Sequence, residues 1–505
     1  MERCDAFDAI DPFAAAASAF DRLQGDLAGL ATAGLAHHAV EELFEERGRE
    51  LLRLLFQGHL DLRARREREQ AGRPPAVVVT GADGLLRPHR ETGHHRKLAC
   101  VFGMVTVERC AWRQKGLSNV HPADRALSLP AGRHSAGLRR LAACEAVRGS
   151  YDQAKTAIER RCGKVLGKRQ AEDLVIAAAR DIDAFYRHQL VMPATADSLL
   201  VFQADGKGIV MRPEALRPAT LKAHRTAQRA MRTRLAPGEK PHRKRMATLA
   251  CVFDATPAPR GPHDIIAPPA GRSRERTPRP GPKATAKWLT GSVVHPPEHT
   301  IAATFDQAEA RDPGHVRTWV ALVDGARHQL DLIHAEAVRR RVTVHVLLDI
   351  VHVKYLWDAA HAFHPPGTAD AETWVAGHLI TILHGQAART AAEITAQAHR
   401  ARLRGTKREA ADACTGYLDQ LRYDTALAAG WPIATGAIEG ACRHLIGDRL
   451  DITGARWGLT GAEAILKLRA LDDNGDFPQY WSYHLAREHE RLYPTPDQHR
   501  FQPTA

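Results

Sequence analysis

The chain has 505 residues, and 44% of them are hydrophobic, which is enough to build several cores and excludes an intrinsically disordered protein. At about 150 residues for one domain, this length predicts roughly three domains. The net charge of +13 favours a partner that carries negative charge, such as nucleic acid, although charge does not determine the fold.

The sequence also indicates the cellular compartment in which the protein is expected. The sequence contains no run of 18 apolar residues that could span a membrane, and residues 1–5 do not resemble the start of a signal peptide. The eight cysteines include no CxxC pair, which argues against a disulfide framework and against a zinc ribbon. We therefore expect a cytoplasmic, nucleoid-associated protein with reduced thiols and no membrane partner.

The N-terminal region, 1–75, is predicted to be helical because leucines recur at helical spacing between residues 33 and 70. Arg73 and the two prolines after it should end this helix. A β-hairpin region is expected at 76–130, with a strand from residue 76 and two apolar runs joined at Gly103. His94, His95, Cys100 and Cys110 raise the alternative of a metal site there, but the two cysteines lack the paired spacing of zinc ligands.

Residues 131–195 predict several short helices. Ser150 is a candidate helix N-cap, and a turn near Gly163 would separate two helices as in a helix-turn-helix DNA-binding domain. The helical face that follows Ser150 is basic, through Lys155, Arg160, Arg161, Lys164, Lys168 and Arg169. A plain helical bundle with a solvated basic face remains the alternative.

The stretch from 198 to 211 contains apolar residues that run into Asp205, two glycines, and a second apolar run. This pattern predicts a hairpin with Asp205 at a strand end, where glycine lets backbone approach a ligand closely. Asp-Gly is also an ordinary turn dipeptide, so the motif alone does not decide between turn and active site.

The most basic stretch follows, from Arg212 to Met246. Eleven Lys or Arg residues stand against two Glu there, which leaves +9 of the total +13. A basic stretch of this density favours phosphate contact over a merely solvated face. The residues expected to bind DNA are Arg225, Arg229, Arg232, Lys240, Arg243, Lys244 and Arg245, with Arg443 and Arg456 from later in the chain.

Strands and helices then alternate. A strand at 247–255, a loop or arm at 257–282 and a helix at 302–311 precede two apolar strands that end at Asp324 and Asp349. This alternation predicts a largely parallel α/β sheet. Residues 365–430 are rich in alanine and predict an all-α insertion, after which Glu439 stands at the start of a late helix.

Asp205, Asp324 and Glu439 are therefore three acidic residues at the ends of predicted elements. Carboxylates gathered from distant parts of a chain suit hard divalent cations, and two Mg²⁺ (or Mn²⁺) ions about 4 Å apart are a known arrangement for phosphoryl transfer. We predict these three residues to be both catalytic and metal-binding.

The chain also resembles the ISKra-type bacterial insertion-sequence transposases, which belong to a broad Mutator-like group. The resemblance extends from about residue 90 to 490, and its motifs are Gln203–Gly206, Gly238–Ala247, Leu322–Ala326, Leu348–Val353, Ala434–Leu445 and Asp451–Gly458. It implies a DDE transposase with an RNase H-like catalytic core, formed by 196–364 and 431–475 and interrupted by the helical insertion. Residues 476–505 are expected to be a C-terminal tail.

Carried over to this sequence, the resemblance makes Asp205, Asp324 and Glu439 the three metal-binding carboxylates. Asp349 and His352 match a D-x-x-H signature of the wider group, which implies a supporting role near the site. Asp349 also ends an apolar strand, so it stays open whether Asp324 or Asp349 is the second ligand. A structural role for His352 stays open as well.

The predicted activity is metal-dependent cleavage of DNA at the terminal inverted repeats of an insertion sequence, followed by joining to target DNA. Since two ends must be brought together, at least a homodimer is expected. A catalytically inactive DNA-binding regulator derived from a transposase and an RNase H-like nuclease that does not transpose are the alternatives.

Overall fold

The computed structural model describes residues 11–73, 78–190, 195–226, 243–266, 278–350, 353–413 and 421–495. The chain forms two compact units, one built from residues 1–187 together with 477–505 and the other from residues 188–476. Each unit is described by itself. Within the described residues, no helix is both long enough and apolar enough to cross a bilayer.

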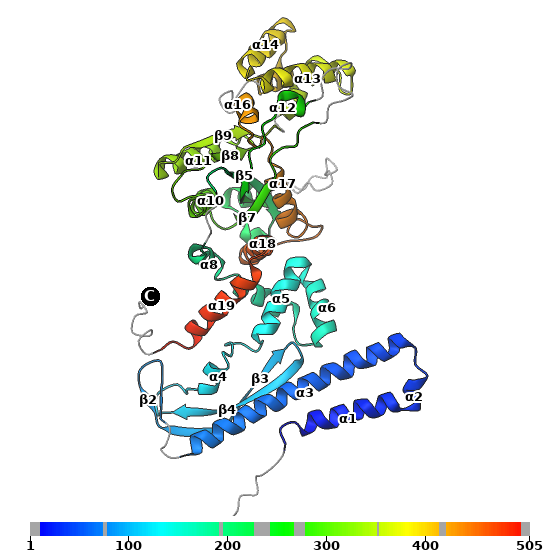
Figure 1. Ribbon diagram of the computed structural model, residues 1–505, viewed down its shortest axis with the longest axis vertical. Helices are drawn as coiled ribbons and strands as arrows, with labels where there is room; N and C mark the ends of the chain where they lie inside the picture. Colours follow the sequence, from blue (N-terminus) through cyan, green and yellow to red (C-terminus); the bar gives the residue numbers. More distant parts are fainter. Residues whose placement is uncertain are drawn as a thin grey trace, which may run out of the picture. The chain divides into compact units, whose positions relative to one another are not determined.

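The first unit begins with a helical hairpin packed beside a β-hairpin (Figure 1). Its elements are α1 (Ala14–Ala28), α2 (Leu30–Ala33), α3 (His37–Gly72), the short strands β1 (Val79–Thr80) and β2 (Leu86–Arg87), the long strands β3 (His89–Cys100) and β4 (Gly103–Arg113), and α4 (Pro122–Ala126). Leu60 of α3 is buried with Leu98, Val105 and Val107 of the hairpin, so the apolar face of the long helix covers one side of β3 and β4. The predicted long helix and hairpin are confirmed, and α3 ends one residue before Arg73.

Helices complete this unit. They are α5 (Ala136–Arg148), α6 (Tyr151–Cys162), α7 (Lys168–Ala178), α8 (Ile182–His188) and α19 (Phe477–Leu492). Ser150 caps α6 by accepting a hydrogen bond from the backbone N–H of Gln153, and Gly163 ends this helix with a positive φ of 77°. Both sequence predictions are confirmed, and DNA contact by these helices stays a prediction.

The prediction of a C-terminal tail at 476–505 was wrong for its first part. α19 is a helix of 16 residues that buries Phe477, Tyr480, Trp481 and His484, which recur at the three- and four-residue spacing of one helical face. The hydroxyl of Tyr480 donates a hydrogen bond to the carbonyl of Ala178, which ties α19 to α7 within the same unit. The aromatic periodicity was present in the sequence, so this helix could have been predicted.

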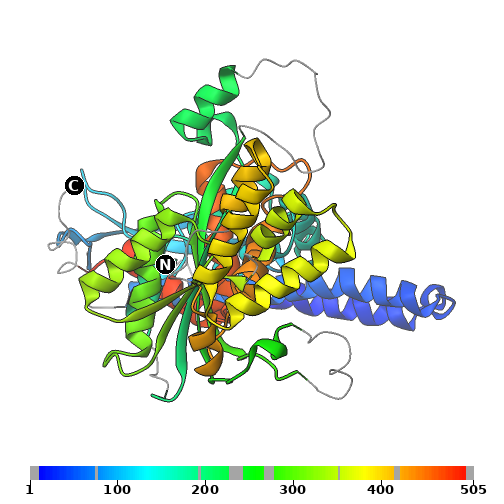
Figure 2. The same ribbon diagram turned by 90° about the horizontal axis from the view of Figure 1, so that it is seen from above.

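The second unit is built on a five-stranded mixed sheet with the strand order β7-β6-β5-β8-β9 (Figure 2). The strands are β5 (Leu199–Val210), β6 (Lys244–Ala255), β7 (Ala284–Ser292), β8 (Trp319–Val323) and β9 (Val344–Leu348). β6 is antiparallel to both of its neighbours, β5 and β7, whereas β8 pairs in parallel with β5 and β9 pairs in parallel with β8. The prediction of a largely parallel sheet was therefore wrong for the two pairings that β6 makes, and the sheet is mixed.

The predicted hairpin around Asp205 was also wrong. Residues 199–210 form one continuous strand that pairs with β6 along its whole length, and Asp205 lies in its middle, opposite Leu249. Gly206 and Gly208 do not make a turn, because the cross-strand pairing of twelve residues outweighs the weak local preference of two glycines. The strand therefore carries Asp205 into the sheet instead of ending at it.

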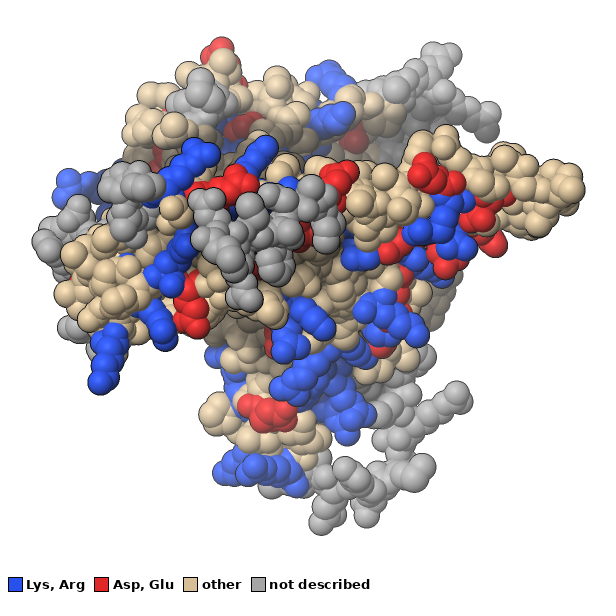
Figure 3. Space-filling model, turned by 90° about the horizontal axis from the view of Figure 1, so that it is seen from below, with Lys and Arg blue, Asp and Glu red and all other residues tan. Residues whose placement is uncertain are grey.

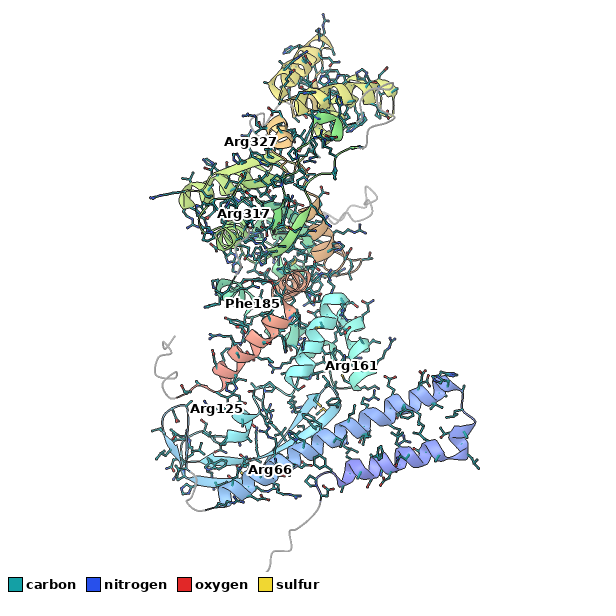
Figure 4. All side chains as sticks on the ribbon, in the orientation of Figure 1. Arg66, Arg125, Arg161, Phe185, Arg317 and Arg327 are labelled. Carbon is teal, nitrogen blue, oxygen red and sulfur yellow. The ribbon has the colours of Figure 1, made fainter. Side chains whose placement is uncertain are left out.

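Helices cover both faces of this sheet. α10 (Pro297–Arg311) and α11 (Arg327–Arg340) lie on one side, while α17 (Gly436–Ala441), the π-helical turn η5 (Cys442–Gly447) and α18 (Leu459–Asp473) lie on the other (Figure 2). Two-sided cover explains why nine of the twelve residues of β5 are buried. Arg317, labelled in Figure 4, is buried beside this sheet and donates to the carbonyls of Ser198 and Leu199 and to the carboxylate of Asp254.

A group of helices follows β9, in agreement with the all-α insertion predicted at 365–430. They are α12 (Val353–Phe363), α13 (Ala369–Leu383), α14 (Ala387–Arg400), α15 (Gly405–Ala413) and α16 (Tyr423–Ala428). The short helices η1 (Pro213–Ala215), α9 (Pro218–Thr226) and η2 (Pro262–Asp264) lie outside the sheet. Part of the predicted arm at 257–282, from 267 to 277, lies outside the described residues.

Candidate functional site

Asp205 and Asp324 belong to neighbouring parallel strands. The last pair of the β5–β8 ladder joins Gln203 to Leu322, and each aspartate comes two residues later in the chain. Asp324 follows the last residue of β8 directly, is exposed, and precedes Gly325, whose φ of 92° turns the chain away from the sheet. The ladder therefore brings the two aspartates to the same level, at the edge where parallel pairing stops.

Gln203 shows which face of the sheet Asp205 uses. Its buried side chain accepts a hydrogen bond from the backbone N–H of Ile438 at 3.0 Å and donates to the carbonyl of Ala434 at 3.2 Å. Because residues two apart on a strand point to the same face, Asp205 points toward the side on which α17 packs. Glu439 is the next residue after Ile438, so the Gln203 amide holds the start of its helix against β5.

A second set of bonds holds the same segment from β9. The backbone N–H of Ile350 donates to the carbonyl of Ile433 at 2.9 Å, and the hydroxyl of Thr435 donates to the carboxylate of Asp349. Asp349 is only 3% exposed, in contrast to the exposed Asp324. Asp349 therefore anchors the chain that leads into α17, which fits a supporting role. His352, predicted beside it, lies outside the described residues.

Cys442 lies between two of the predicted carboxylates. Its thiol donates a hydrogen bond of 3.2 Å to Oδ2 of Asp205, while Oδ1 of Asp205 accepts from the backbone N–H of Gly206 at 2.6 Å. Burial raises the pKa of the Cys442 thiol, and the negative charges of Asp205 and Glu439 raise it further. The thiol of Cys442 therefore stays neutral and lies directly against Asp205.

The three predicted ligands do not form one tight group. Among the described residues, the only set of three whose ligand atoms all lie within 4.8 Å of one another is Asp181, His484 and Glu488, in the other unit. The structure thus brings Asp205 next to Cys442 and sets Asp324 at the matching level of the next strand. It does not close Asp205, Asp324 and Glu439 into a cage for a single ion.

The set in the first unit is better explained as an ion-pair network. Asp181 is buried and accepts two hydrogen bonds of 2.7 Å from Arg491, while its carboxylate and Nδ1 of His484 are 2.7 Å apart. Burial by itself would raise the pKa of Asp181, but the hydrogen bonds from His484 and Arg491 outweigh burial and lower the pKa. Arg491 supplies the positive charge that a metal ion would otherwise provide.

The predicted DNA-binding residues have different environments. Arg225, Arg443 and Arg456 are exposed, and Arg243 is half-buried. Lys244 forms an ion pair of 3.1 Å with Asp451, and Arg245 donates to the carbonyls of Val293, Ala215 and Val294, which gives Arg245 a structural role. Arg229, Arg232 and Lys240 lie outside the described residues. On the face drawn in Figure 3, basic side chains gather in patches that acidic side chains interrupt.

Gln203 and Cys442 were missed as functional residues by sequence reasoning, although both lie within the motifs quoted above. A glutamine two residues before a catalytic candidate on an apolar strand is a signal, because a buried amide must find partners. Comparison with known protein families and with curated proteins finds no match for this chain.

Proposed function

We propose that the chain is a DDE transposase, an enzyme that cuts DNA at the ends of an insertion sequence and joins the freed ends to target DNA. Support comes from the sheet. RNase H-like cores have three antiparallel strands followed by two parallel strands next to the first one, and the order β7-β6-β5-β8-β9 has this arrangement. In such a core, an acidic residue in the middle of the first strand is expected beside one that follows the fourth.

One observation carries the proposal. Asp205, in the middle of β5, and Asp324, directly after β8, are level on neighbouring strands, and the helix of Glu439 is tied to β5 by Gln203. These are the three acidic residues that the sequence motifs selected independently of the fold. The helical insertion between β9 and α17 is compatible with this arrangement, because its two ends return to the sheet at Ile350 and Ile433.

The side chains suit Mg²⁺ or Mn²⁺ by their chemistry, since carboxylate oxygens are the preferred ligands of these ions. Two ions about 4 Å apart, each about 2 Å from its ligands, would separate the outermost ligand oxygens by up to roughly 8 Å. Asp324 and Glu439 would be those outer ligands and Asp205 the shared one. A set of this kind does not need to fall within the 4.8 Å that a single ion would require.

The residues then have distinct roles in the two steps. When bound, the ions supply the charge that activates a water and stabilises the departing 3′ oxygen. Asp205 would help to hold the ions, and its place in a strand that is paired along its whole length fixes the position of its carboxylate. The freed 3′-hydroxyl is the nucleophile of the second step, and Arg225, Arg243, Arg443 and Arg456 would contact phosphates.

The structure also bears on the choice between Asp324 and Asp349. Asp349 is buried and accepts a hydrogen bond from Thr435, so ion binding there would have to break an existing contact. Asp324 is exposed at the strand end, and its Oδ1 accepts a local hydrogen bond of 3.1 Å from the backbone N–H of Ala326. We therefore propose Asp324 as the second ligand and Asp349 as a residue that positions Thr435.

The test is cleavage and strand transfer with Mg²⁺ on DNA that flanks the coding sequence, comparing the wild type with three single variants, Asp205→Asn, Asp324→Asn and Glu439→Gln. We expect each replacement to lower both steps by at least about 1,000-fold, because one ligand charge is lost while the shape is kept. Asp331→Asn, an exposed carboxylate on α11, is the matched control and should retain full activity.

The outcome separates the alternatives. If the wild-type chain binds the flanking DNA and neither cuts nor joins it, the protein is a DNA-binding regulator. If it cuts any duplex equally well and never joins strands, it is a nuclease. Activity that survives Asp324→Asn and is lost in Asp349→Asn, with folding intact, would contradict the ligand set proposed above.

A further inference from the structure

Helix α3 leaves one long face uncovered. Two other sides of the helix are packed within the unit, since Leu60 and Ala64 are buried beside the β-hairpin and Gly58 lies against Pro12 and Phe13 at the start of α1. Three large apolar side chains on the remaining face are exposed, namely Phe44 at 47%, Leu52 at 49% and Leu55 at 41%. Such exposure along one helix face marks an interaction surface.

The charged residues on this face complete a stripe that is symmetric about the midpoint between Arg53 and Leu54. The stripe consists of Glu41, Phe44, Leu52, Leu55, Arg63 and Arg66, all exposed. At 100° per residue, these side chains fall within about 100° of the helix circumference, and they extend along about 38 Å of its axis. Glu41 and Arg66 are equally far from the midpoint, and so are Phe44 and Arg63, and Leu52 and Leu55.

We propose that this stripe is the surface through which two copies of the chain associate, with their α3 helices antiparallel across a two-fold axis. In that arrangement Glu41 of each copy faces Arg66 of the other, and the leucines meet in the centre. A parallel arrangement would place Glu41 against Glu41 and Arg66 against Arg66, which is repulsive. The charge pattern therefore selects both the partner, a second copy, and its direction.

The surroundings of Arg63 and Arg66 agree with this arrangement. Both border a cavity of about 400 Å³ between α3, β4 and α4, whose apolar lining includes Leu60 and Val107. Phe44 of the second copy would lie opposite Arg63, where its ring can stack on the guanidinium and reach the mouth of this cavity. Arg66 is labelled on α3 in Figure 4. The inference uses no part of the proposed catalytic site.

The test is the molar mass of the full chain in solution, measured by light scattering after nuclease treatment and without added DNA. We expect the wild type to have twice the 55.5 kDa of one chain. Glu41→Arg and Arg66→Glu should each raise the dissociation constant at least about tenfold, because each replaces two attractive pairs by two repulsive ones. Mixing the two variants should restore a dimer, because Arg at position 41 of one copy then faces Glu at position 66 of the other.

Controls keep the result interpretable. Glu46→Arg reverses an exposed charge on the same helix but away from the stripe, so it should leave the molar mass unchanged. Circular dichroism must show that each variant retains its helix content. A monomeric wild type, single variants that associate as strongly as wild type, or a mixture that stays monomeric would each overturn the proposal.

Discussion

Gln203 offers a quantitative test of how the predicted site is held together. Its amide is 1% exposed, and it is the side chain that joins β5, the strand of Asp205, to the segment that leads into Glu439. Gln203→Leu keeps the size of the side chain and removes both hydrogen bonds. The backbone N–H of Ile438 and the carbonyl of Ala434 would then stay buried without this partner.

The expected magnitude follows from those two groups. A buried polar group that loses its partner costs about 1–3 kcal/mol, so two such groups lower the local stability of residues 434–438 by roughly 2–6 kcal/mol. Even the lower value raises the equilibrium constant for opening of this segment by about 30-fold. Glu439 would then sample positions away from Asp205, and DNA cleavage should fall by a similar factor or more.

Hydrogen exchange read by mass spectrometry measures this opening directly. Peptides that cover Ala434 to Ala441 should lose protection by at least about 30-fold in Gln203→Leu, while those from β7 should not change. Gln329→Leu is the matched control, because Gln329 is also buried but its side-chain oxygen has no hydrogen-bond partner among the described residues. Unchanged protection together with unchanged cleavage in Gln203→Leu would refute the role given to this amide.

Three further predictions follow from single side chains. Cys442→Ala should lower cleavage by about 2- to 10-fold, and Cys442→Ser should preserve it, since only the serine keeps a donor for Asp205. Burial raises the pKa of Cys251 to about 12, so its contribution to stability should be complete below pH 9 and fall by about 1.4 kcal/mol per pH unit from pH 9 to 12. Urea unfolding of Cys251→Ala should therefore show a correspondingly smaller loss of stability over this range. Asp181 has a lowered pKa, so its contribution to stability is present above its unfolded pKa and is lost as pH falls through the folded one. Acid unfolding of Asp181→Asn should therefore depend less on pH, and EDTA should not alter thermal unfolding of the first unit if Arg491 replaces a metal there.

The elements of the second unit could largely be predicted from the sequence, but their pairing could not. Apolar runs that end at Asp324 and Asp349 marked β8 and β9 because buried parallel strands are continuously hydrophobic. The pairing of β5 with β6 along twelve residues depends on a strand that begins 34 positions after β5 ends. Local turn signals at Gly206 and Gly208 therefore pointed to a hairpin that tertiary pairing overrides.

In the candidate site, too, some residues could be predicted from the sequence and others could not. Asp205, Asp324 and Glu439 could be selected from their context, because acidic residues after apolar runs are unusual. For the residues that hold them, the sequence indicates at most that the amide of Gln203 needs partners. The partners of Gln203 in α17 and of Cys442 in β5 are known only from the structure. Among the basic residues, Arg245 could not be separated from its neighbours by sequence, since its carbonyl partners at Val293 and Val294 come from a distant loop.

The most direct test of the central claim is the position of Mn²⁺ in crystals of the chain bound to its flanking DNA, located by anomalous scattering. We predict Mn²⁺ between the carboxylates of Asp205 and Asp324, with a second site between Asp205 and Glu439. Mn²⁺ bound only at Asp181, His484 and Glu488, or a scissile phosphate placed away from Asp205, would contradict the proposed function.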